Sequence, residues 1–520
     1  MIMKNKKNKN YKMSTLITTA ISYPNGPPHI GHLYEAILAD IMNRIYNLNG
    51  FDSKLLTGTD EHGQKVAQAA EAEGEKPKAF TDRMAQLFLE MNHKINASPD
   101  VFIRTTEKRH HEAAKALWKK LEDAGQIYKS TYAGWYAVRD EAYFDESEIV
   151  NGKAPSGAPV EWMEESSYFF RLSAWERPLL DYYEAHPQAI APIGRRNEVL
   201  SFIKGGLRDL SISRTKFTWG VEVPTDPEHV MYVWVDALTN YMTALGYPDI
   251  EGKEFQVFWP ESLHLIGKDI LRFHAVYWPA FLLAAGITPP HRIFAHGWWT
   301  HEGEKMSKSL GNVVDPLKLI DTYGLDSIRY YLMREIPFGQ DGSFSDASLI
   351  QRINSDLAND LGNLVQRVLS FIYKNVGAEI PKPDELLGQD QEMLAKASHL
   401  HELLGEDMEA QALQAYCQHI WEVVSEANRY VDAQKPWSLK KSAHPQDHVR
   451  MGTVLYVLAE VIRHIAIYIQ PIMPDSASRI LDQLGQDKRS FEALKIPLKS
   501  GGVLPAPSPI FPKVENSSSL

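Results

Sequence analysis

Residues 15–32 decide the fold, and they read TLITTAISYPNGPPHIGH. Residues 15–21 form a short, apolar and β-branched run, which is typical of a buried strand. The proline, asparagine and glycine residues at 24–28 predict a tight turn. A helix should follow the turn, because apolar side chains recur there at spacings of three and four on one helical face: Ile30, Leu33, Ile37, Ile41 and Ile45.

A second short strand is expected at Lys54–Thr57, after Gly50 has ended the helix. A strand, a turn, a helix and a strand in this order predict a βαβ unit with a parallel sheet. Ligands of such sheets bind at the carboxyl ends of the strands. The fold class is therefore α/β, with a Rossmann-like parallel sheet.

The sheet is expected to be split by an insertion. Residues 126–229 carry Tyr, Trp, Gly and Pro at irregular short intervals, which favours a separate β-rich module, and the α/β pattern resumes at Met231–Asp236. Later apolar runs at Leu263–Gly267 and Arg292–Ala295 predict further strands. The expected domains are a disordered tail at 1–13, the Rossmann-like halves at 14–125 and 230–300, the connective insertion at 126–229, a loop region at 301–348, an α-helical bundle at 349–498 and a flexible tail at 499–520. The first residue of the working protein could be Met1 or Met13.

Composition narrows the class of protein. The chain has 520 residues, of which 44% are hydrophobic and 23% charged, as in ordinary globular proteins. The apolar stretch Val454–Ile472 is interrupted by charged residues, so we expect a core helix there and no membrane span. One cysteine, Cys417, excludes an internal disulfide and a cysteine-built metal cluster. The net charge of -11 weighs mildly against a nucleic-acid partner, although local basic patches can override it.

The turn before the first helix carries His29-Ile30-Gly31-His32. Backbone donors and the helix dipole at such a position favour an anion. Gly31 lets a phosphate or a flat ring approach the backbone. Surface histidines near a turn would give the same four letters, so this motif alone leaves the function open.

A second motif, Lys305-Met306-Ser307-Lys308-Ser309, follows a polar, glycine-containing loop. Two ammonium groups beside two hydroxyls suit a flexible phosphate clamp, since lysine acts as a mobile point charge. The two motifs occur together, in this order and separated by an insertion. This combination disfavours the interpretation that the second motif is an ordinary solvated loop.

HIGH and KMSKS resemble the paired signatures of the class I aminoacyl-tRNA synthetases. The resemblance implies that the amino-acid carboxylate attacks the α-phosphorus of ATP and that pyrophosphate leaves. It implies that His29, Gly31 and His32 contact ATP, that Lys305 and Lys308 belong to the catalytic loop, and that Lys308 stabilises the leaving pyrophosphate. Mg²⁺ is expected to accompany the ATP. No protein nucleophile is involved, so catalysis would rest on positioning and charge stabilisation.

Four further segments resemble the methionyl-tRNA synthetases within this class: residues 20–26, 58–63, 232–237 and 266–274. The resemblance implies that Asp60 pairs with the substrate ammonium and that aromatic rings face the thioether, a contact worth roughly 0.3–1.5 kcal/mol. Two residues depart from some relatives, Ser22 and Leu238, and they affect the fine shape of the pocket. The implied L-methionine pocket is Ala20, Ile21, Tyr23, Asp60, Trp234, Ala237, Leu238, Tyr241, Ile270 and His274.

The helical C-terminal half resembles the anticodon-binding domain of the same enzymes. Asn363 and Arg367 are four residues apart on one helical face, and Trp437 follows a proline. The resemblance implies that these three residues bind the anticodon of tRNA(Met), where stacking on an unpaired base contributes about 1–3 kcal/mol. Trp437 could instead pack the bundle after the proline.

Three alternatives are less well supported. A small-molecule nucleotidyltransferase of the same fold would not need the KMSKS loop or the helical half, and a charging assay with tRNA would separate the two. A catalytically inactive binding relative would have lost signature histidines or lysines. The sister enzymes for Ile, Val and Leu carry a larger insertion, and the cysteine-specific enzymes need a zinc ligand set that this chain lacks.

The resemblance also sets expectations about metal and assembly. Many methionyl-tRNA synthetases hold zinc on cysteine knuckles in the inserted module, but the matching positions here are Ala137, Asp140, Lys153 and Ser156, so no structural zinc is expected. Some relatives dimerise through an appended domain, which is not expected in this chain, so a monomer is predicted. A cytoplasmic location is expected, with no membrane partner.

Overall fold

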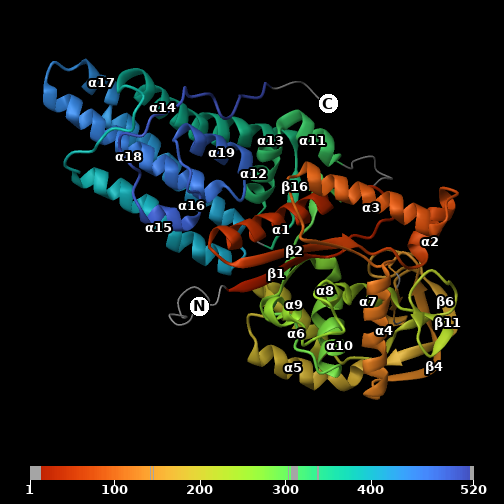
Figure 1. Cartoon of the computed structure of the whole chain (residues 1–520). Helices are drawn as coiled ribbons and strands as arrows, with labels where there is room; N and C mark the ends of the chain where they lie inside the picture. The colour runs from red at the N-terminus through yellow and green to blue at the C-terminus, as the bar shows by residue number, and fades with distance from the viewer. Residues whose placement is uncertain are drawn as a thin grey trace. The chain divides into compact units, whose positions relative to one another are not determined.

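The computed structural model describes residues 13–140, 142–144, 146–301, 304–305, 314–336 and 339–515 (Figure 1). The chain forms two compact units. The first comprises Ser14–Asn43 and Asp52–Gly297, and the second contains Arg44–Phe51 and the chain from Trp298 onward.

A six-stranded parallel sheet organises the first unit, in the order β3-β2-β1-β12-β13-β7. Its strands are β1 (Ser14–Thr19), β2 (Asp52–Thr59), β3 (Val101–Arg104), β7 (Ile190–Ala191), β12 (Leu263–Gly267) and β13 (Arg292–His296). The β1 residue Ile17 pairs with Leu55 of β2 and Leu263 of β12, and it is fully buried. Burial on both faces explains why β1 is continuously apolar and β-branched. The expected Rossmann-like sheet is confirmed.

Helices cover both faces of this sheet. In Figure 1, α1 and α3 lie on one side of β1 and β2, and α8, α9 and α10 lie on the other. The helices are α1 (Ile30–Leu48), α2 (Gln64–Ala72), α3 (Pro77–Lys94), α4 (Lys108–Asp123), α5 (Glu176–Ala185), α6 (Ile193–Lys204), α7 (Val233–Leu238), α8 (Asn240–Thr243), α9 (Lys253–Phe258) and α10 (Trp278–Ala284).

The insertion is β-rich, as expected, but only part of it stands apart from the main sheet. Its strands form a four-stranded antiparallel sheet and a three-stranded one: β4 (Ile127–Ala137), β5 (Ala142–Phe144), β6 (Glu161–Phe170), β8 (Leu210–Ser211), β9 (Ser213–Arg214), β10 (Glu222–Val223) and β11 (Asp226–Met231). Between β6 and β8, the chain returns to the parallel sheet through β7, which pairs with β13. The expected insertion of 126–229 therefore includes a segment that belongs to the Rossmann-like sheet.

The stretch Met231–Asp236 is only partly a strand. Met231 ends β11, and residues 233–238 form the short helix α7. A short apolar run does not distinguish a strand from a buried helical turn. This helix carries three residues of the predicted pocket, Trp234, Ala237 and Leu238.

The second unit joins a small sheet to a helical bundle. The sheet has the order β15-β14-β16, with β14 (Trp299–His301), β15 (Glu304–Lys305) and β16 (Gly342–Phe344). The helices are α11 (Pro316–Tyr323), α12 (Leu325–Glu335), α13 (Asp346–Arg352), α14 (Asn363–Asn375), α15 (Gly388–Glu409), α16 (Leu413–Gln434), α17 (Pro436–Lys441), α18 (Pro445–Ile469) and α19 (Pro474–Gln483). A π-helical segment, Ile353–Gly362, links α13 to α14.

Helix α18 is long and apolar enough to cross a membrane by length and composition, but 94% of its apolar window is buried inside the protein. The prediction of a core helix is confirmed. The helix is buried on all faces in its second half, and its charged residues are paired: Arg463 donates from Nε and Nη2 to Glu460 at 2.7 Å each. A buried charged side chain is tolerated when it is paired and hydrogen-bonded, so this pairing allows the helix to lie in the core.

The expected flexible tail at 499–520 is wrong for residues up to 515. Leu504 and Ile510 are buried, and Asn354 bonds the backbone of Val514 in both directions at 2.9 Å. A composition rich in Pro and Ser suggests disorder, but side chains of the bundle satisfy this backbone and its two apolar residues fill gaps. Residues 516–520 lie outside the described residues.

Candidate active site

The predicted pocket residues follow the carboxyl ends of the parallel strands. Ala20 follows β1, Asp60 follows β2, and Ile270 and His274 follow β12. The backbone N–H of Ala20 donates to Leu265 at 3.1 Å, and that of Asp60 donates to Ser22 at 2.9 Å. The strands are parallel, so these ends meet at one edge, where α/β proteins bind ligands.

The His29–His32 turn opens α1 at this edge. The two imidazoles stack with centroids 3.9 Å apart, and the backbone N–H of Gly31 donates to His29 Nδ1 at 3.0 Å. A Cβ on Gly31 would lie 2.9 Å from His29 Cε1, so glycine is what lets the ring fold over the helix start. Burial lowers the pKa of His32 well below its usual value, and the neighbouring His29 lowers it further. The His32 ring is therefore neutral.

A polar chain fixes the back of the pocket. His274 Nδ1 lies 3.0 Å from the Ile270 carbonyl and Nε2 lies 2.7 Å from the Tyr241 hydroxyl. A carbonyl only accepts, so Nδ1 carries the proton and Nε2 accepts from Tyr241. Burial lowers the pKa of His274 to about 4, although the hydrogen bond to the Ile270 carbonyl acts to raise it. The ring is therefore neutral at physiological pH.

The remaining predicted pocket residues pack around this chain. The Trp234 ring stacks on Phe273 with centroids 3.9 Å apart, and it meets His274 edge-on at 5.9 Å. Tyr23 donates from its hydroxyl to the His62 carbonyl at 3.0 Å. Ala20, Tyr23, Trp234 and Ile270 border the same apolar core that contains Leu238 and Tyr241, while Ile21 is half-buried and Ala237 is buried.

Two carboxylates, Glu35 and Asp60, influence the Tyr241 phenol. Burial raises the pKa of this phenol, and the charges of Glu35 and Asp60 raise it further. Sequence reasoning missed Glu35, which accepts from the Ala20 N–H at 2.6 Å and contacts His296 Nε2 at 3.1 Å. Its position three residues after His32, on the same helical face, was the available signal.

A buried carboxylate at Asp236 was also missed. It lies 2.6 Å from His62 Nδ1 and 2.7 Å from His110 Nε2. Burial would raise its pKa, but the two imidazoles hold the pKa well below its usual range. Asp236 ties α7, which bears Trp234, to the loop after β2, which bears Asp60. No sequence signal distinguishes this pairing, because its members are far apart in the chain.

A pocket lies beside the histidine turn. It is bordered by β1, β2, β3, α1 and α3, and its lining residues include Thr19, Ala20, Ser22, His32, Glu35, Thr57, Gly58, Phe88, Met91, Asn92 and Phe102. The pocket brings a predicted ATP-binding histidine and a predicted methionine-binding residue together.

The second motif is only partly described. Lys305 lies on β15, where its backbone pairs with Thr300. Lys308 and the rest of the motif, residues 306–309, lie outside the described residues.

The predicted anticodon residues lie in the helical bundle. Arg367, on α14, places its guanidinium carbon 5.2 Å from the centroid of the Trp437 ring, which lies on α17. Arg367 also pairs with Asp432 at 2.8 Å. Asn363 is exposed at the start of α14, one turn before Arg367. The structure therefore brings Arg367 and Trp437 together and places Asn363 on the same helix.

The knuckle positions of the insertion are joined by direct contacts. Ser156 Oγ bonds the Asp140 carboxylate and accepts from Arg139 Nη2 at 3.0 Å. Ala137 is buried with Ala154 and Ala158 in a small apolar cluster. Among the described residues, no group of three or more His, Cys, Asp or Glu side chains could hold a metal ion.

A split parallel sheet, a histidine turn at a strand end and a helical bundle carrying Arg and Trp together define a class I tRNA synthetase. Comparison with known families agrees. Residues 15–158 and 147–369 match the family model described as tRNA synthetases class I (M), and residues 390–501 match that of the anticodon-binding domain of tRNA ligase.

Curated relatives narrow the family. The chain is 53% identical over 506 residues to the methionine–tRNA ligase of Mycobacterium tuberculosis (strain CDC 1551 / Oshkosh), covering 96% of this chain and 98% of the relative. It is 54% identical over 505 residues to that of Brucella suis, covering 96% and 97%. A solved structure of the M. tuberculosis methionyl-tRNA synthetase with methionyl-adenylate superposes with a TM-score of 0.94 at 53% identity, covering 96% of this chain and 100% of that one. The chain belongs to the methionyl-tRNA synthetase family.

Proposed function

We propose that the chain activates L-methionine with ATP and transfers it to tRNA(Met). In the first step, the methionine carboxylate attacks the α-phosphorus of ATP, and pyrophosphate leaves. In the second, a hydroxyl at the 3′ end of initiator or elongator tRNA attacks the carbonyl, and AMP leaves. The observation that carries the proposal is the pocket that brings Ala20, at the end of β1, together with His32 of the histidine turn; the hydrogen bond between Tyr241 and His274 at 2.7 Å supports it.

Each pocket residue has a proposed role. Asp60 pairs with the methionine ammonium, helped by the second negative charge of Glu35. Trp234, Tyr23 and Tyr241 offer aromatic surface to the thioether. Ala20, Ile21, Ala237, Leu238, Ile270 and His274 complete the pocket. A neutral His274 that already accepts from Tyr241 leaves no cation beside the apolar side chain, which suits methionine.

ATP is proposed to bind at the start of α1, where His29, Gly31 and His32 lie. Lys305 and Lys308 are proposed to meet the phosphates, with Lys308 stabilising the leaving pyrophosphate. We propose that Mg²⁺ accompanies ATP. This ion binds chiefly through substrate phosphates, water and one or two carboxylates, so it does not need a cluster of three protein ligands.

The tRNA partner is proposed to be read by Asn363, Arg367 and Trp437. Stacking of the Arg367 guanidinium on Trp437 is the contact that supports this, since an aromatic ring and a cation suit an unpaired base. We further propose a cytoplasmic monomer without a membrane partner and without structural zinc.

The test is amino-acid-dependent pyrophosphate exchange with each of the twenty amino acids. Methionine alone should support rapid exchange. Asp60→Ala should abolish it while the fold is retained, because the substrate ammonium would enter a closed site without its partner. Asp123→Ala is the matched control, because this exposed aspartate lies on α4 and pairs with Lys119 of the same helix. Near-normal exchange by Asp60→Ala would refute the assignment of the ammonium site.

A further inference from the structure

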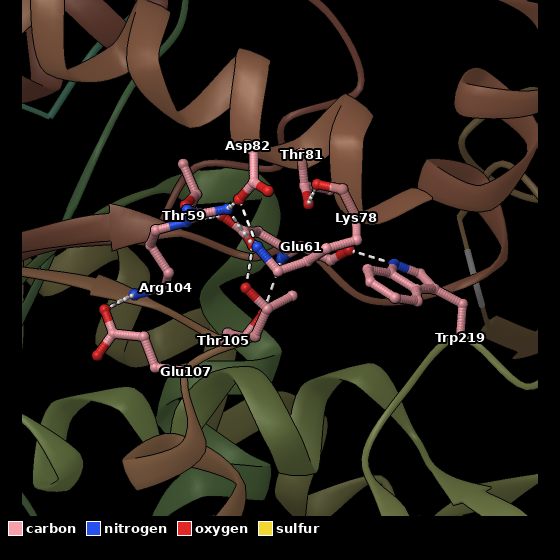
Figure 2. Close-up of polar contacts among 10 residues, drawn as sticks. Thr59, Glu61, Lys78, Thr81, Asp82, Arg104, Thr105, Glu107 and Trp219 are labelled. Carbon is pink, nitrogen blue, oxygen red and sulfur yellow. Dashed lines mark hydrogen bonds and ion pairs between the residues drawn. The ribbon is translucent and has the colours of Figure 1, made fainter. Parts of the chain in front are cut away.

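The loop after β2 is held far more tightly than an ordinary strand-to-helix connection. Residues 59–63 read TDEHG and include Asp60. The next residue, Glu61, is fully buried, and Figure 2 shows its carboxylate at the centre of a polar cluster. A buried carboxylate is unfavourable unless it is paired and hydrogen-bonded, so this cluster needs an explanation.

The carboxylate of Glu61 is fully engaged. Arg104 of β3 donates from Nε to Oε1 at 2.6 Å and from Nη2 to Oε2 at 3.0 Å. Thr59 donates to Oε1 at 2.8 Å, and Thr106 donates to Oε2 at 2.5 Å. A two-pronged arginine–carboxylate pair fixes direction as well as distance.

The backbone of the same loop is also fixed. Thr105 accepts from the Glu61 N–H at 2.9 Å, while Trp219 donates from its indole to the Glu61 carbonyl at 2.6 Å and accepts from the Gly63 N–H at 3.1 Å. Figure 2 shows Trp219 reaching the loop from the opposite side to Arg104. Two separate chain segments, residues 104–106 and Trp219, therefore hold this loop.

This clamp determines where Asp60 points. The side chains of Thr59 and Glu61 bond one another, so they lie on the same side of the chain. In an extended backbone, the residue between them projects to the other side. Asp60 is buried there, and its N–H donates to the Ser22 carbonyl in the segment after β1 at 2.9 Å; the raised pKa of Tyr241, to which the charge of Asp60 contributes, supports placing this side at the pocket. A rotation of the loop about Glu61 would carry Asp60 with it.

We infer that Glu61 and Arg104 are positioning residues for methionine, which orient Asp60 toward the substrate ammonium without touching the substrate. The inference rests on the proposed function, since it needs Asp60 as the ammonium partner. Thr106 and Trp219 support the same geometry. Asp82 lies on the outer side of the clamp, where it accepts from Arg104 at 2.5 Å and pairs with Lys78.

The experiment measures methionine binding and pyrophosphate exchange in Glu61→Gln and Arg104→Lys. Glu61→Gln keeps the shape of the side chain and removes its charge. Arg104→Lys keeps the charge and removes the bidentate geometry. Both should raise KM for methionine by about 10–100-fold, the effect of a small misplacement at a site, with KM for ATP unchanged. Asp123→Ala, on the exposed face of α4 and away from the clamp, is the control, and its KM for methionine should equal that of the wild type.

A second measurement, the affinity for a methionine analogue without an amino group, distinguishes a positioning role of Glu61 from a general structural role. The analogue 4-(methylthio)butanoate is methionine without its amino group, so its affinity should be the same in Glu61→Gln and wild type. In the Asp60→Ala background, Glu61→Gln should add no further loss of methionine affinity, because the two residues act through one contact. A structural role would instead weaken both ligands and would add to the loss.

The outcomes are distinguishable. If Asp60→Ala binds methionine normally, the ammonium assignment fails. If Asp60→Ala loses affinity while Glu61→Gln and Arg104→Lys do not, the positioning role alone is overturned. Should Glu61→Gln fail to fold, Thr106→Val removes a single bond at Oε2 and carries the same test, with a smaller rise in KM for methionine expected and an unchanged KM overturning the inference.

Discussion

Glu35 connects two parts of the pocket, because one oxygen fixes the Ala20 backbone and the other contacts His296. Burial would lower the pKa of His296, but the bond and charge of Glu35, together with the Gly297 carbonyl, raise it above its usual value of 6.5. A folded-state pKa above the unfolded value means that this interaction stabilises fully below about pH 6.5 and is lost as pH rises through the folded pKa.

We therefore predict that the His296 ring titrates above pH 6.5 in the wild type, as followed by NMR of labelled histidine. In Glu35→Gln, burial is opposed only by the Gly297 carbonyl and the charge of Asp269, so the midpoint should fall below that of the wild type. The Glu35–His296 pair should contribute about 1.5–3 kcal/mol at pH 5.5 to 6, the range for hydrogen bonds to charged groups, and less at pH 8.5. A wild-type midpoint below 6.5 would contradict the pairing.

Residues in local motifs could be predicted from the sequence, and residues that support them could not. His29, Asp60 and Trp234 lie in short sequence motifs whose residue types indicate a binding role. Asp236 was not distinguishable from any core-facing polar residue, because its partners His62 and His110 become neighbours only in the folded sheet. Pairings between distant segments depend on topology, which a single sequence does not display.

At the scale of elements, the junction of α16 and α17 allows a direct test of the proposed anticodon role of Trp437. Lys435 adopts a left-handed conformation at this junction, and Pro436 begins α17, which directs Trp437 toward Arg367 of α14. Trp437→Ala should leave methionyl-adenylate formation unchanged and weaken tRNA binding by about 1–3 kcal/mol, the value of one stacked base. Tyr373→Ala is the control, since this exposed aromatic residue lies on the same α14.

The measurement is tRNA charging at subsaturating tRNA, with pyrophosphate exchange run alongside. Equal charging by wild type and Trp437→Ala would show that the ring serves the bundle. A parallel loss of exchange would show that the variant disturbs the whole chain and would remove the basis for an anticodon role.

Strands with a continuous apolar run were predictable, and a two-residue strand was not. The runs at Leu263–Gly267 and Arg292–Ala295 became β12 and β13 nearly residue for residue. The two-residue strand β7 gave no period to detect, although it returns the chain to the parallel sheet. Its placement follows from pairing with β13, which is a tertiary contact, so the extent of the insertion could not be set from sequence.

At the scale of the whole molecule, the proposal of a zinc-free insertion requires that packing and hydrogen bonds stabilise this module. In the described part of the insertion, Ser156 joins Asp140 and Arg139, and Lys153 exchanges two backbone bonds with Val150 at 3.0 and 3.1 Å. The aromatic rings of the module are buried unequally: Tyr136 is buried, whereas Trp162 is 57% exposed and meets Trp135 edge-on. The interior is instead built from small side chains.

That interior is the cluster of Ala137, Ala154 and Ala158, with Phe144 and Val160 against it. Hydrogen bonds and close packing then replace what metal–ligand bonds supply elsewhere. We predict that dialysis against a strong chelator leaves the melting temperature of the purified enzyme unchanged and that its zinc content is well below one per chain. Stoichiometric zinc, or a melting temperature that falls on chelation, would show a metal-built module.

A positive control shows that the melting temperature reports on this module. Ala158→Leu forces extra volume into a close-packed cluster, which should destabilise it by about 1–3 kcal/mol. The melting temperature of Ala158→Leu should therefore fall by the same amount with and without chelator. If the variant is sensitive to the chelator while the wild type is not, metal binds the module when its packing is loosened, and packing alone does not account for its stability.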